Sequence, residues 1–334
     1  MVKSWFSTER TYILSVLVVV SFSICLLPKT AFTAEKYSPW AGEFLRMGVG
    51  AKAMGMGNAY SAIEGDIFSS YYNPAGLAVM DGRQLAVSQR YMSMDRYMTH
   101  LAFGSRIGPD ADFAFSWIGA GTDDVQGRDL NGNKTGIIKD SRNSFAISFA
   151  KSMGGKISVG LNTKISLWKL AGEDAKAIGF DGGIIFRPVK NITASFVVRD
   201  INSRFTWKSE RWSETISGAD GQPMEKEDKL PLYYTVGMAY RSFDDKLIIS
   251  AMTESVQDNP TGFDFGAAYK VMKAFTLRGG IYNYTPSGGL DAGSLTVGFS
   301  LQVTGTIALD YAYTNDTIAN DKINLISLDL SYGE

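Results

Sequence analysis

The chain has 334 residues, of which 45% are hydrophobic and 12% aromatic, with 35 glycines and a formal net charge of −1. Abundant aromatic residues and a low net charge exclude a disordered chain, and only one apolar run approaches the ~20 residues that a membrane-spanning helix needs. The remaining class is a compact, strand-rich protein. It includes outer-membrane barrels, in which apolar residues alternate along strands and form no long runs.

The N-terminal segment has the order of a secretory signal. Lys3 and Arg10 precede a 16-residue apolar run, residues 12–27, which is followed by the small-residue stretch 30–34. A basic, then apolar, then small-residue order is typical of export signals. The run is short for a membrane-spanning helix, so we expect residues 1–34 to be removed. An uncleaved anchor is the alternative, and Phe32 leaves the cleavage position open.

The expected mature chain carries no cysteine. The single one, Cys25, lies in the signal, and Ile24 before it is not the small residue that lipid attachment requires. Removal of residues 1–34 leaves 30 basic and 33 acidic residues, a balance that argues against a nucleic-acid partner. An exported protein without disulfides needs another source of stability, and a closed sheet supplies one.

Residues 35–83 lack a period of two and are dense in glycine and other small residues. They include the stretch GEFLRMGVGAKAMGMGNAYSAIEGD at 42–66 and YYNPAGLA at 71–78. Small residues let a segment bend and pack closely against other backbone. We therefore expect a plug, or hatch, in which Asn73 and Pro74 form a turn and play a structural role.

From residue 84 to the end, the chain alternates between apolar and polar residues. We expect fourteen strands, at 84–91, 99–107, 112–120, 142–150, 156–168, 177–187, 192–200, 233–241, 247–253, 262–270, 275–284, 294–303, 306–313 and 323–332. Most segments have the ~9–11 residues of a tilted membrane strand. Strict alternation means one apolar and one polar face, so residues 84–334 are predicted to form an all-β, transmembrane antiparallel barrel.

The gaps between these segments alternate in length. Every second gap has at most five residues, and the others have at least seven. Short periplasmic turns and longer outside loops are typical of an outer-membrane barrel. The first gap is a long one, so the first strand should rise from the periplasm, and an even strand number returns the C-terminus there, next to the aromatic Tyr332.

Charged residues on the polar face should point into the lumen, because charges facing lipid are unfavourable. They are Arg90, Lys164, Asp181, Arg187, Arg199, Asp264, Lys270, Arg278, Asp310 and Asp329. Two interpretations are open. These residues form a paired interior network, or some of them contact a ligand.

Three patterns imitate chemical sites. Gly48, Gly50 and Ala53 match a loose dinucleotide pattern, but no strand precedes them and no βαβ unit follows. Residues 129–140 partly imitate a calcium loop, yet Lys134 stands where that loop needs glycine. The single histidine, His100, lies near serines without a clear Ser/His/acid set. We expect no enzyme, no catalytic residues, no cofactor and no metal site.

The glycine-rich stretch at 42–66 followed by YYNPAGLA resembles the N-terminal signature of the PorV/PorQ family of outer-membrane proteins. That family is similar to the FadL long-chain fatty acid transporters, which share an NPAG-type motif and a fourteen-stranded barrel with an N-terminal hatch. The close match covers about forty residues. The resemblance assigns a structural or gating role to the motif residues Gly48, Gly50, Gly55, Gly57, Asn73, Pro74, Ala75 and Gly76.

The resemblance implies a monomeric outer-membrane barrel, surrounded by outer-membrane lipid, that binds or transports hydrophobic, fatty-acid-like molecules. We expect the ligand to enter through the loops at 121–141 and 201–232, where Trp207 and Trp212 either form an entrance or simply pack the loop. PorV-like members also imply an alternative, a type IX secretion shuttle that binds the C-terminal signal domains of secreted protein cargo.

Overall fold

The computed structural model describes residues 41–209, 224–242, 244–256, 261–285, 293–316 and 321–333. The chain divides into two units, residues 1–36 and 37–334, and the second is described by itself. The predicted export signal, residues 1–34, lies outside the described residues.

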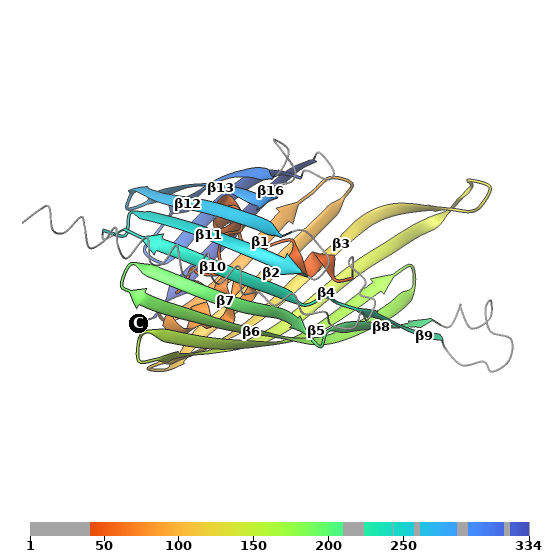
Figure 1. The fold of residues 1–334 in the computed structure, drawn as a ribbon. Helices are drawn as coiled ribbons and strands as arrows, with labels where there is room; N and C mark the ends of the chain where they lie inside the picture. Colours follow the sequence, from red (N-terminus) through yellow and green to blue (C-terminus); the bar gives the residue numbers. More distant parts are fainter. Residues whose placement is uncertain are drawn as a thin grey trace, which may run out of the picture. The chain divides into compact units, whose positions relative to one another are not determined.

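Fourteen antiparallel strands form a closed barrel, which confirms the predicted fold class (Figure 1). They are β1 (Arg83–Tyr91), β2 (Arg96–Gly108), β3 (Ala111–Arg128), β4 (Lys134–Met153), β5 (Ile157–Leu170), β6 (Glu173–Val189), β7 (Ile192–Ile201), β10 (Tyr233–Arg241), β11 (Leu247–Val256), β12 (Gly262–Met272), β13 (Phe275–Tyr284), β14 (Ser294–Gln302), β15 (Ile307–Asp316) and β16 (Asp321–Tyr332). Each pairs with its neighbours along the chain, and β7 pairs with β10. The barrel closes where β1 pairs with β16, from Arg83 opposite Tyr332 to Tyr91 opposite Asn324.

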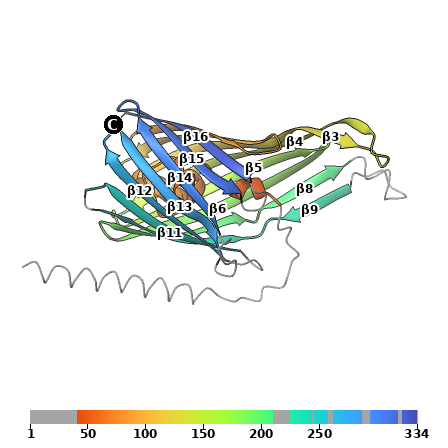
Figure 2. The ribbon, with the colours of Figure 1, turned by 90° about the horizontal axis from the view of Figure 1, so that it is seen from above.

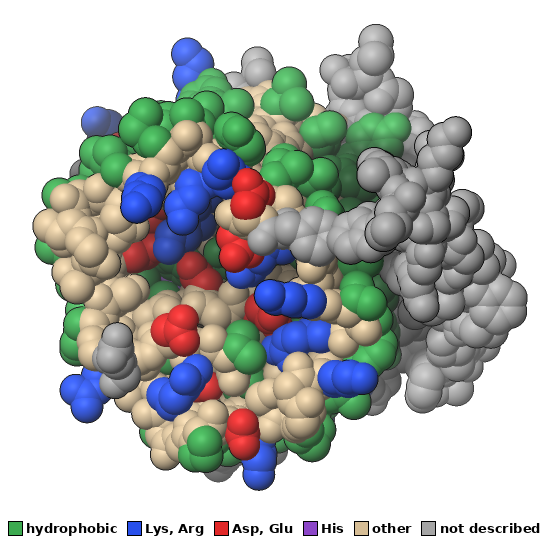
Figure 3. Space-filling model, turned by 90° about the vertical axis from the view of Figure 1, so that its left-hand side faces the viewer, with side chains coloured by type: hydrophobic (Ala, Val, Ile, Leu, Met, Phe, Trp, Pro, Cys, Tyr) green, Lys and Arg blue, Asp and Glu red, His purple; other side chains and the backbone are tan. Residues whose placement is uncertain are grey.

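Side chains alternate between an exposed apolar outer face and a buried inner face. On β5, Leu161 is 65% exposed, whereas the next residue, Asn162, is 3% exposed. The outer faces carry exposed Leu, Ile, Val and Phe, including Phe149, Ile178 and Leu295. At the end of the barrel where β16 ends, hydrophobic side chains line the periphery and charged ones gather toward the middle (Figure 3). This arrangement matches a barrel with a lipid-facing surface.

Two of the predicted loops contain strand. Residues 121–141 were expected to form an outside loop, but β3 and β4 continue their ladder there as far as Arg128 opposite Lys134, which leaves 129–133 as the turn. The segment 201–232 contains a hairpin of β8 (Arg204–Ser209) and β9 (Met224–Lys229), and β8 pairs with β6. The end of the barrel at which β3 and β4 extend is called the mouth below. Much of the alternation in gap length therefore reflects strands that extend at the mouth.

The chain before β1 lies inside the barrel, and we call residues 41–82 the hatch (Figure 2). It contains four short helices, η1 (Glu43–Arg46), α2 (Ala51–Gly55), α3 (Ser69–Tyr72) and η2 (Pro74–Val79). Large apolar side chains of the hatch, such as Phe44, Met54 and Phe68, are completely or almost completely buried. Within the described residues, no helix has the length and apolar character needed to cross a bilayer.

Candidate functional site

The NPAG motif forms the start of helix η2. Asn73 is the N-cap residue: its Oδ1 accepts a hydrogen bond from the Ala75 amide at 3.1 Å, and Pro74 occupies the first turn. Both features favour a helix start, because the cap satisfies a free amide and proline has none. The Asn73 Nδ2 also donates to the Ser61 carbonyl at 2.9 Å. The motif thus joins two parts of the hatch. Its structural or gating role stays a prediction.

Two glycines of the barrel wall make room for this turn. Gly160 on β5 and Gly183 on β6 lie opposite each other in the strand ladder. A Cβ atom on Gly160 would lie 2.3 Å from the Ala75 amide nitrogen, and one on Gly183 would lie 2.0 Å from Asn73 Oδ1. Both distances are far below contact distance, so the motif can rest on this wall only because the wall has no side chains there.

We expect Asn73→Ala to lower the free energy of unfolding by about 1–3 kcal/mol, because it removes a helix cap and leaves the buried Ser61 carbonyl without that donor. Urea unfolding in lipid vesicles and hydrogen exchange across residues 74–79 measure the effect. Asn131→Ala, in the exposed β3–β4 turn, is the control and should change neither quantity. Equal results for the two variants would contradict the capping role.

The other glycines of the motif bring the hatch backbone against its surroundings. Gly48 and Gly50 have φ values of 79° and 77°, and Gly57 has a φ of 61°. These left-handed conformations favour glycine. A Cβ on Gly57 would lie 2.6 Å from the carbonyl oxygens of Phe265 and Ile281 in the barrel wall. Gly55 lies against β13 and β14, and Gly76 packs against Ser69 within the hatch.

Side chains of the wall cap helix α2. The amide of Gly50 donates to Ser88 Oγ at 3.3 Å, and the amide of Ala51 donates to Ser327 Oγ at 2.8 Å. The first amides of a helix lack partners within the helix, and no side chain of the helix itself caps them. The barrel therefore completes a helix that is too short to be stable alone.

Ion pairs link the hatch to the wall, including one between the exposed Asp81 and Arg106 of β2 at 3.9 Å. Lys52 pairs with Asp329 of β16, Glu43 with Arg142 of β4, and Glu64 with Arg187 of β6. The Lys52 Nζ also lies 3.2 Å from Oδ2 of Asp66, within the hatch. Burial by itself lowers the pKa of Lys52, but the carboxylates of Asp66 and Asp329 outweigh burial and raise that pKa well above its usual value. Lys52 thus stays charged at neutral pH.

The residues predicted to face the lumen lie inside the barrel. Nine of the ten have partners there: Lys164 with Asp181 and Asp200, Arg199 with Glu254, Arg278 with Asp310 and Ser300, Asp264 with the Asn283 amide, Arg90 with Met54 Sδ, Arg187 with Glu64, and Asp329 with Lys52. Lys270 is the exception, because it is exposed near the end of β12. Whether any of these residues contacts a ligand stays a prediction.

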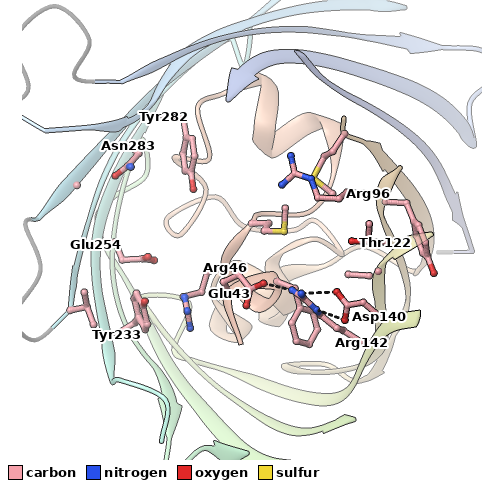
Figure 4. Close-up of a pocket in the computed structure, with 18 of the residues that line it drawn as sticks. Glu43, Arg46, Arg96, Thr122, Asp140, Arg142, Tyr233, Glu254, Tyr282 and Asn283 are labelled. Carbon is pink, nitrogen blue, oxygen red and sulfur yellow. Dashed lines mark hydrogen bonds and ion pairs between the residues drawn. The ribbon is translucent and has the colours of Figure 1, made fainter. Parts of the chain in front are cut away.

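A cavity of about 690 Å³ lies at the mouth, above the hatch (Figure 4). Its apolar and aromatic lining is Phe44, Met47, Met92, Tyr97, Ala120, Val256, Tyr233 and Tyr282, and its charged lining is Glu43, Arg46, Arg96, Asp140, Arg142, Glu254 and Asp264. Of the residues predicted to face the lumen, only Asp264 lines this cavity. The lumen-facing residues predicted from the sequence lie mostly in the middle of the strands, so the prediction missed the residues at the mouth. Asp140, Arg142 and Glu254 continue the same alternation on the inward-facing side and are the signal that could have found them.

Most charges of the mouth cavity are paired. Arg142 pairs with Glu43, donates to Asp140 at 2.7 Å, and stacks over the ring of Trp168 with 4.5 Å between its guanidinium carbon and the ring centroid. Arg46 lies over the ring of Tyr233 at 4.8 Å. Paired charges beside apolar and aromatic side chains suit a ligand that is mostly apolar and carries few polar groups.

Trp207 packs against the mouth of the barrel. Its ring lies 5.1 Å from that of Trp168, and its Nε1 donates to Asp228 on β9 at 2.8 Å. Phe205 and Leu230, at the base of the hairpin, are buried against Gly42 of the hatch. This contact pattern favours loop packing over an entrance for Trp207. Trp212 lies outside the described residues.

At the opposite end of the barrel is a smaller cavity of about 240 Å³. It is lined by hatch residues 62–64 and by the turns that follow β6 and β10, including Lys190, Asn191 and Asp245. The hatch lies between this cavity and the mouth cavity. Passage of a molecule from one to the other therefore requires the hatch to move.

The patterns that imitate chemical sites have structural explanations. Asp129 accepts hydrogen bonds from the side chain and amide of Asn133, which lower its pKa, and from the amide of Asn131. His100 is buried beside Phe68, and Ser88, opposite it in the ladder, caps the hatch. Among the described residues, no group of three His, Cys, Asp or Glu side chains is placed to hold a metal ion.

No family model matches the sequence, and no curated protein matches it. Solved structures do. The chain is similar to a structure titled "CymD monoaromatic hydrocarbon channel", with a TM-score of 0.61 and 14% identity over 86% of this chain and 98% of that one. It is also similar to a FadL homologue of Pseudomonas aeruginosa, with a TM-score of 0.55 and 14% identity over 84% of this chain and 97% of that one.

The toluene transporter TodX of Pseudomonas putida is a third similar structure, with a TM-score of 0.56 and 15% identity over 84% of this chain and 96% of that one. At such identities the likeness concerns the fold. The structural neighbours of this chain are thus hydrophobic-compound channels of the FadL type, as the resemblance of the N-terminal motif implied. The resemblance to the PorV/PorQ family stays a prediction that rests on the N-terminal motif.

Proposed function

We propose that the protein is an outer-membrane channel that binds small hydrophobic molecules, such as fatty acids, and passes them across the membrane. The observation that carries this proposal is the mouth cavity of about 690 Å³ above a hatch that fills the lumen. A cavity of this volume lies within the usual range for small-molecule sites. The fold likeness to three hydrophobic-compound channels supports the same function.

The outer surface of the barrel supports a membrane location. Large apolar side chains are exposed around the strands, including Phe115, Leu161, Ile249, Leu277 and Leu328. A band of this extent would be unfavourable in water and is expected where strands contact lipid. Together with the N-terminal segment that resembles an export signal, it favours the outer membrane of a diderm bacterium.

The mouth cavity suggests how a ligand is held. Phe44, Met47 and Val256 offer apolar contacts, and the methionine can adapt to ligands of different shape. A single polar group of the ligand would meet the hydroxyl of Tyr282 or the guanidinium of Arg96, which line the same cavity. The ligand then reaches the far cavity when the hatch shifts at its glycines, of which Gly48, Gly50 and Gly57 have positive φ.

Uptake into vesicles tests the proposal. Purified protein in lipid vesicles should accelerate entry of a long-chain fatty acid or a monoaromatic hydrocarbon, but not of a disaccharide. A variant in which Tyr282 and Met47 are both replaced by Asp should reduce this acceleration at least severalfold, because it places new charges in the cavity. A similar double change to Asp at the exposed turn residues Asn131 and Asn133 is the control. No acceleration across a broad panel of apolar compounds would refute the function.

One observation favours the shuttle alternative. The ribbon formed by β3 and β4 projects at the mouth and exposes Val125, Leu130 and Ile137, which offer an apolar contact surface to a protein partner. If the protein holds secreted cargo, cross-links placed at Leu130 should capture a cargo signal domain in cells. A source genome without type IX secretion components, or without cargo that carries such domains, would refute this alternative and leave the channel function intact.

A further inference from the structure

Basic side chains gather on one sector of the outer face at the mouth. Lys139 of β4, Lys169 of β5 and Lys176 of β6 all occupy exposed positions on the outward-facing side of their strands. In the ladder, Lys169 lies opposite Ser141 and Asp174, Lys176 lies opposite Leu167, and the Lys139 carbonyl accepts from the Ala171 amide. The three lysines are therefore diagonal neighbours on adjacent strands, and we call them the lysine row.

The lysine row lies just beyond the apolar band. Along the same strands and toward the middle of the barrel, the outward-facing side chains are Phe145, Ile165 and Ile178, all exposed. Lysines at this level, with their aliphatic stems along apolar surface, reach the headgroup layer of a surrounding membrane. The row thus lies where the barrel passes from acyl chains to lipid headgroups.

The charges of the row are little compensated by the protein. Lys139 and Lys176 have no ion pair with any described residue. Lys169 lies 3.6 Å from Asp174, but both side chains are more than half exposed, so the pair is weak. The neighbouring hairpin adds Lys208 and Arg204, which are paired with Glu225 and Glu227 in exposed ion pairs. The five basic and three acidic side chains named here give a net positive charge of two.

The rest of the rim differs. On β10 to β15, the outward-facing side chains nearest the mouth that the structure describes are uncharged: Tyr234, Ser255, Phe263, Tyr284, Leu295 and Asn315. The next strand, β16, carries one exposed lysine, Lys322. A general need for charge at the headgroup level would distribute lysines around the barrel. Their concentration on three adjacent strands points to a specific anionic partner.

We propose that the lysine row binds the phosphate groups of lipid A, the phosphorylated glycolipid of the outer leaflet. The inference rests on the proposed function, because the outer-membrane orientation with the first strand rising from the periplasm places the mouth in that leaflet. Lysine ammonium groups bind phosphate oxygens through charge-assisted hydrogen bonds, and several close together can hold more than one phosphate. The site would anchor this sector of the barrel, next to the β8–β9 hairpin, in the lipid layer.

Native mass spectrometry of the purified barrel with added lipid A tests the proposal. Each lysine near an anionic lipid surface is worth roughly a fivefold factor, so the triple variant K139Q/K169Q/K176Q should bind lipid A on the order of 100-fold more weakly. The control K151Q/K270Q/K273Q removes three exposed lysines near the other end of the barrel and should bind as the wild type does. Added salt should weaken wild-type binding.

Binding tests with two further lipids identify the partner. Dephosphorylated lipid A and phosphatidylglycerol should both bind the wild type much more weakly than lipid A. Equal binding of either lipid, equal losses in the two triple variants, or no loss in K139Q/K169Q/K176Q would overturn the proposal. The triple variant should still accelerate uptake of the hydrophobic ligand in phospholipid vesicles. The lipid A proposal can therefore be refuted while the channel function stands. A failure of uptake in the wild type would refute the channel function separately.

Discussion

Replacing Gly183 by valine is expected to displace the hatch from the barrel wall. A Cβ at this position would lie 2.0 Å from Asn73 Oδ1, and the obstructing atom belongs to a buried side chain that caps η2 and bonds to the Ser61 carbonyl. Both the side chain and the wall backbone are held by packing, so the overpacking should remove about 3 kcal/mol from the stability of the seated hatch. The strand itself should tolerate valine, a residue that favours β-structure.

Ion conductance in planar bilayers measures the effect most directly. A displaced hatch should open the lumen and raise conductance severalfold, and hydrogen exchange should accelerate across residues 41–82. Gly182→Val is a matched control on the adjacent residue, because its Cβ would meet only Leu161 Cδ2 at an ordinary 3.7 Å. If both variants conduct as the wild type does, the close contact between the motif and the wall does not hold the hatch.

Lys52→Met should have the second large effect. The substitution leaves the buried Asp329 and the partly buried Asp66 without their shared cation, and the loss of one member of a buried ion pair typically lowers stability by about 3–5 kcal/mol. The loss should concentrate in α2, which carries Lys52 and rests on β14 to β16. Hydrogen exchange of residues 50–57 measures the local loss of stability in α2. Urea unfolding in vesicles measures the loss for the whole protein.

The matched control is Lys246→Met, which breaks the exposed pair with Asp244 in the β10–β11 turn and should cost less than 1 kcal/mol. The double variant Lys52→Met with Asp329→Asn should recover part of the loss, because it removes one of the uncompensated carboxylates. A Lys52→Met protein as stable as the control would show that this ion pair does not secure the hatch.

The pH dependence of the Lys52 contribution has a defined sign. The folded pKa of Lys52 is raised above its unfolded value, so its stabilisation is fully present below the unfolded pKa and is lost only as the pH rises through the folded one. The stability difference between the wild type and Lys52→Met should therefore persist from pH 6 to about pH 9. The difference should shrink only in strongly alkaline solution. A difference that vanishes near neutral pH would contradict this assignment.

The barrel was predictable from the sequence because its signal is local. A strand with one face toward lipid must alternate, as Leu161 and Asn162 show on β5, and the period of two appears in any short window of the chain. All fourteen predicted strands are present. Their ends were less accurate, because β3 and β4 continue as a paired ribbon through residues that were expected to form a loop.

The hatch was predictable in composition but not in its contacts. Closely spaced glycines indicated close packing, yet the partners of Gly57 are carbonyls more than 200 residues away on β12 and β13. Likewise, nothing near Gly160 or Gly183 in the sequence distinguishes them as the positions on which the motif rests, since both look like ordinary strand glycines.

By itself, the sequence determined the barrel, its strand number and the presence of a glycine-rich segment before it, because alternation and composition are properties of neighbouring residues. Only the tertiary structure decided which side chains meet. Closure of the barrel brings Glu43 to Arg142 and Lys52 to Asp329, and it places Tyr233, Glu254 and Tyr282 around one cavity. Such pairings depend on strand register and on the path of the hatch through the lumen, which no short window of sequence encodes.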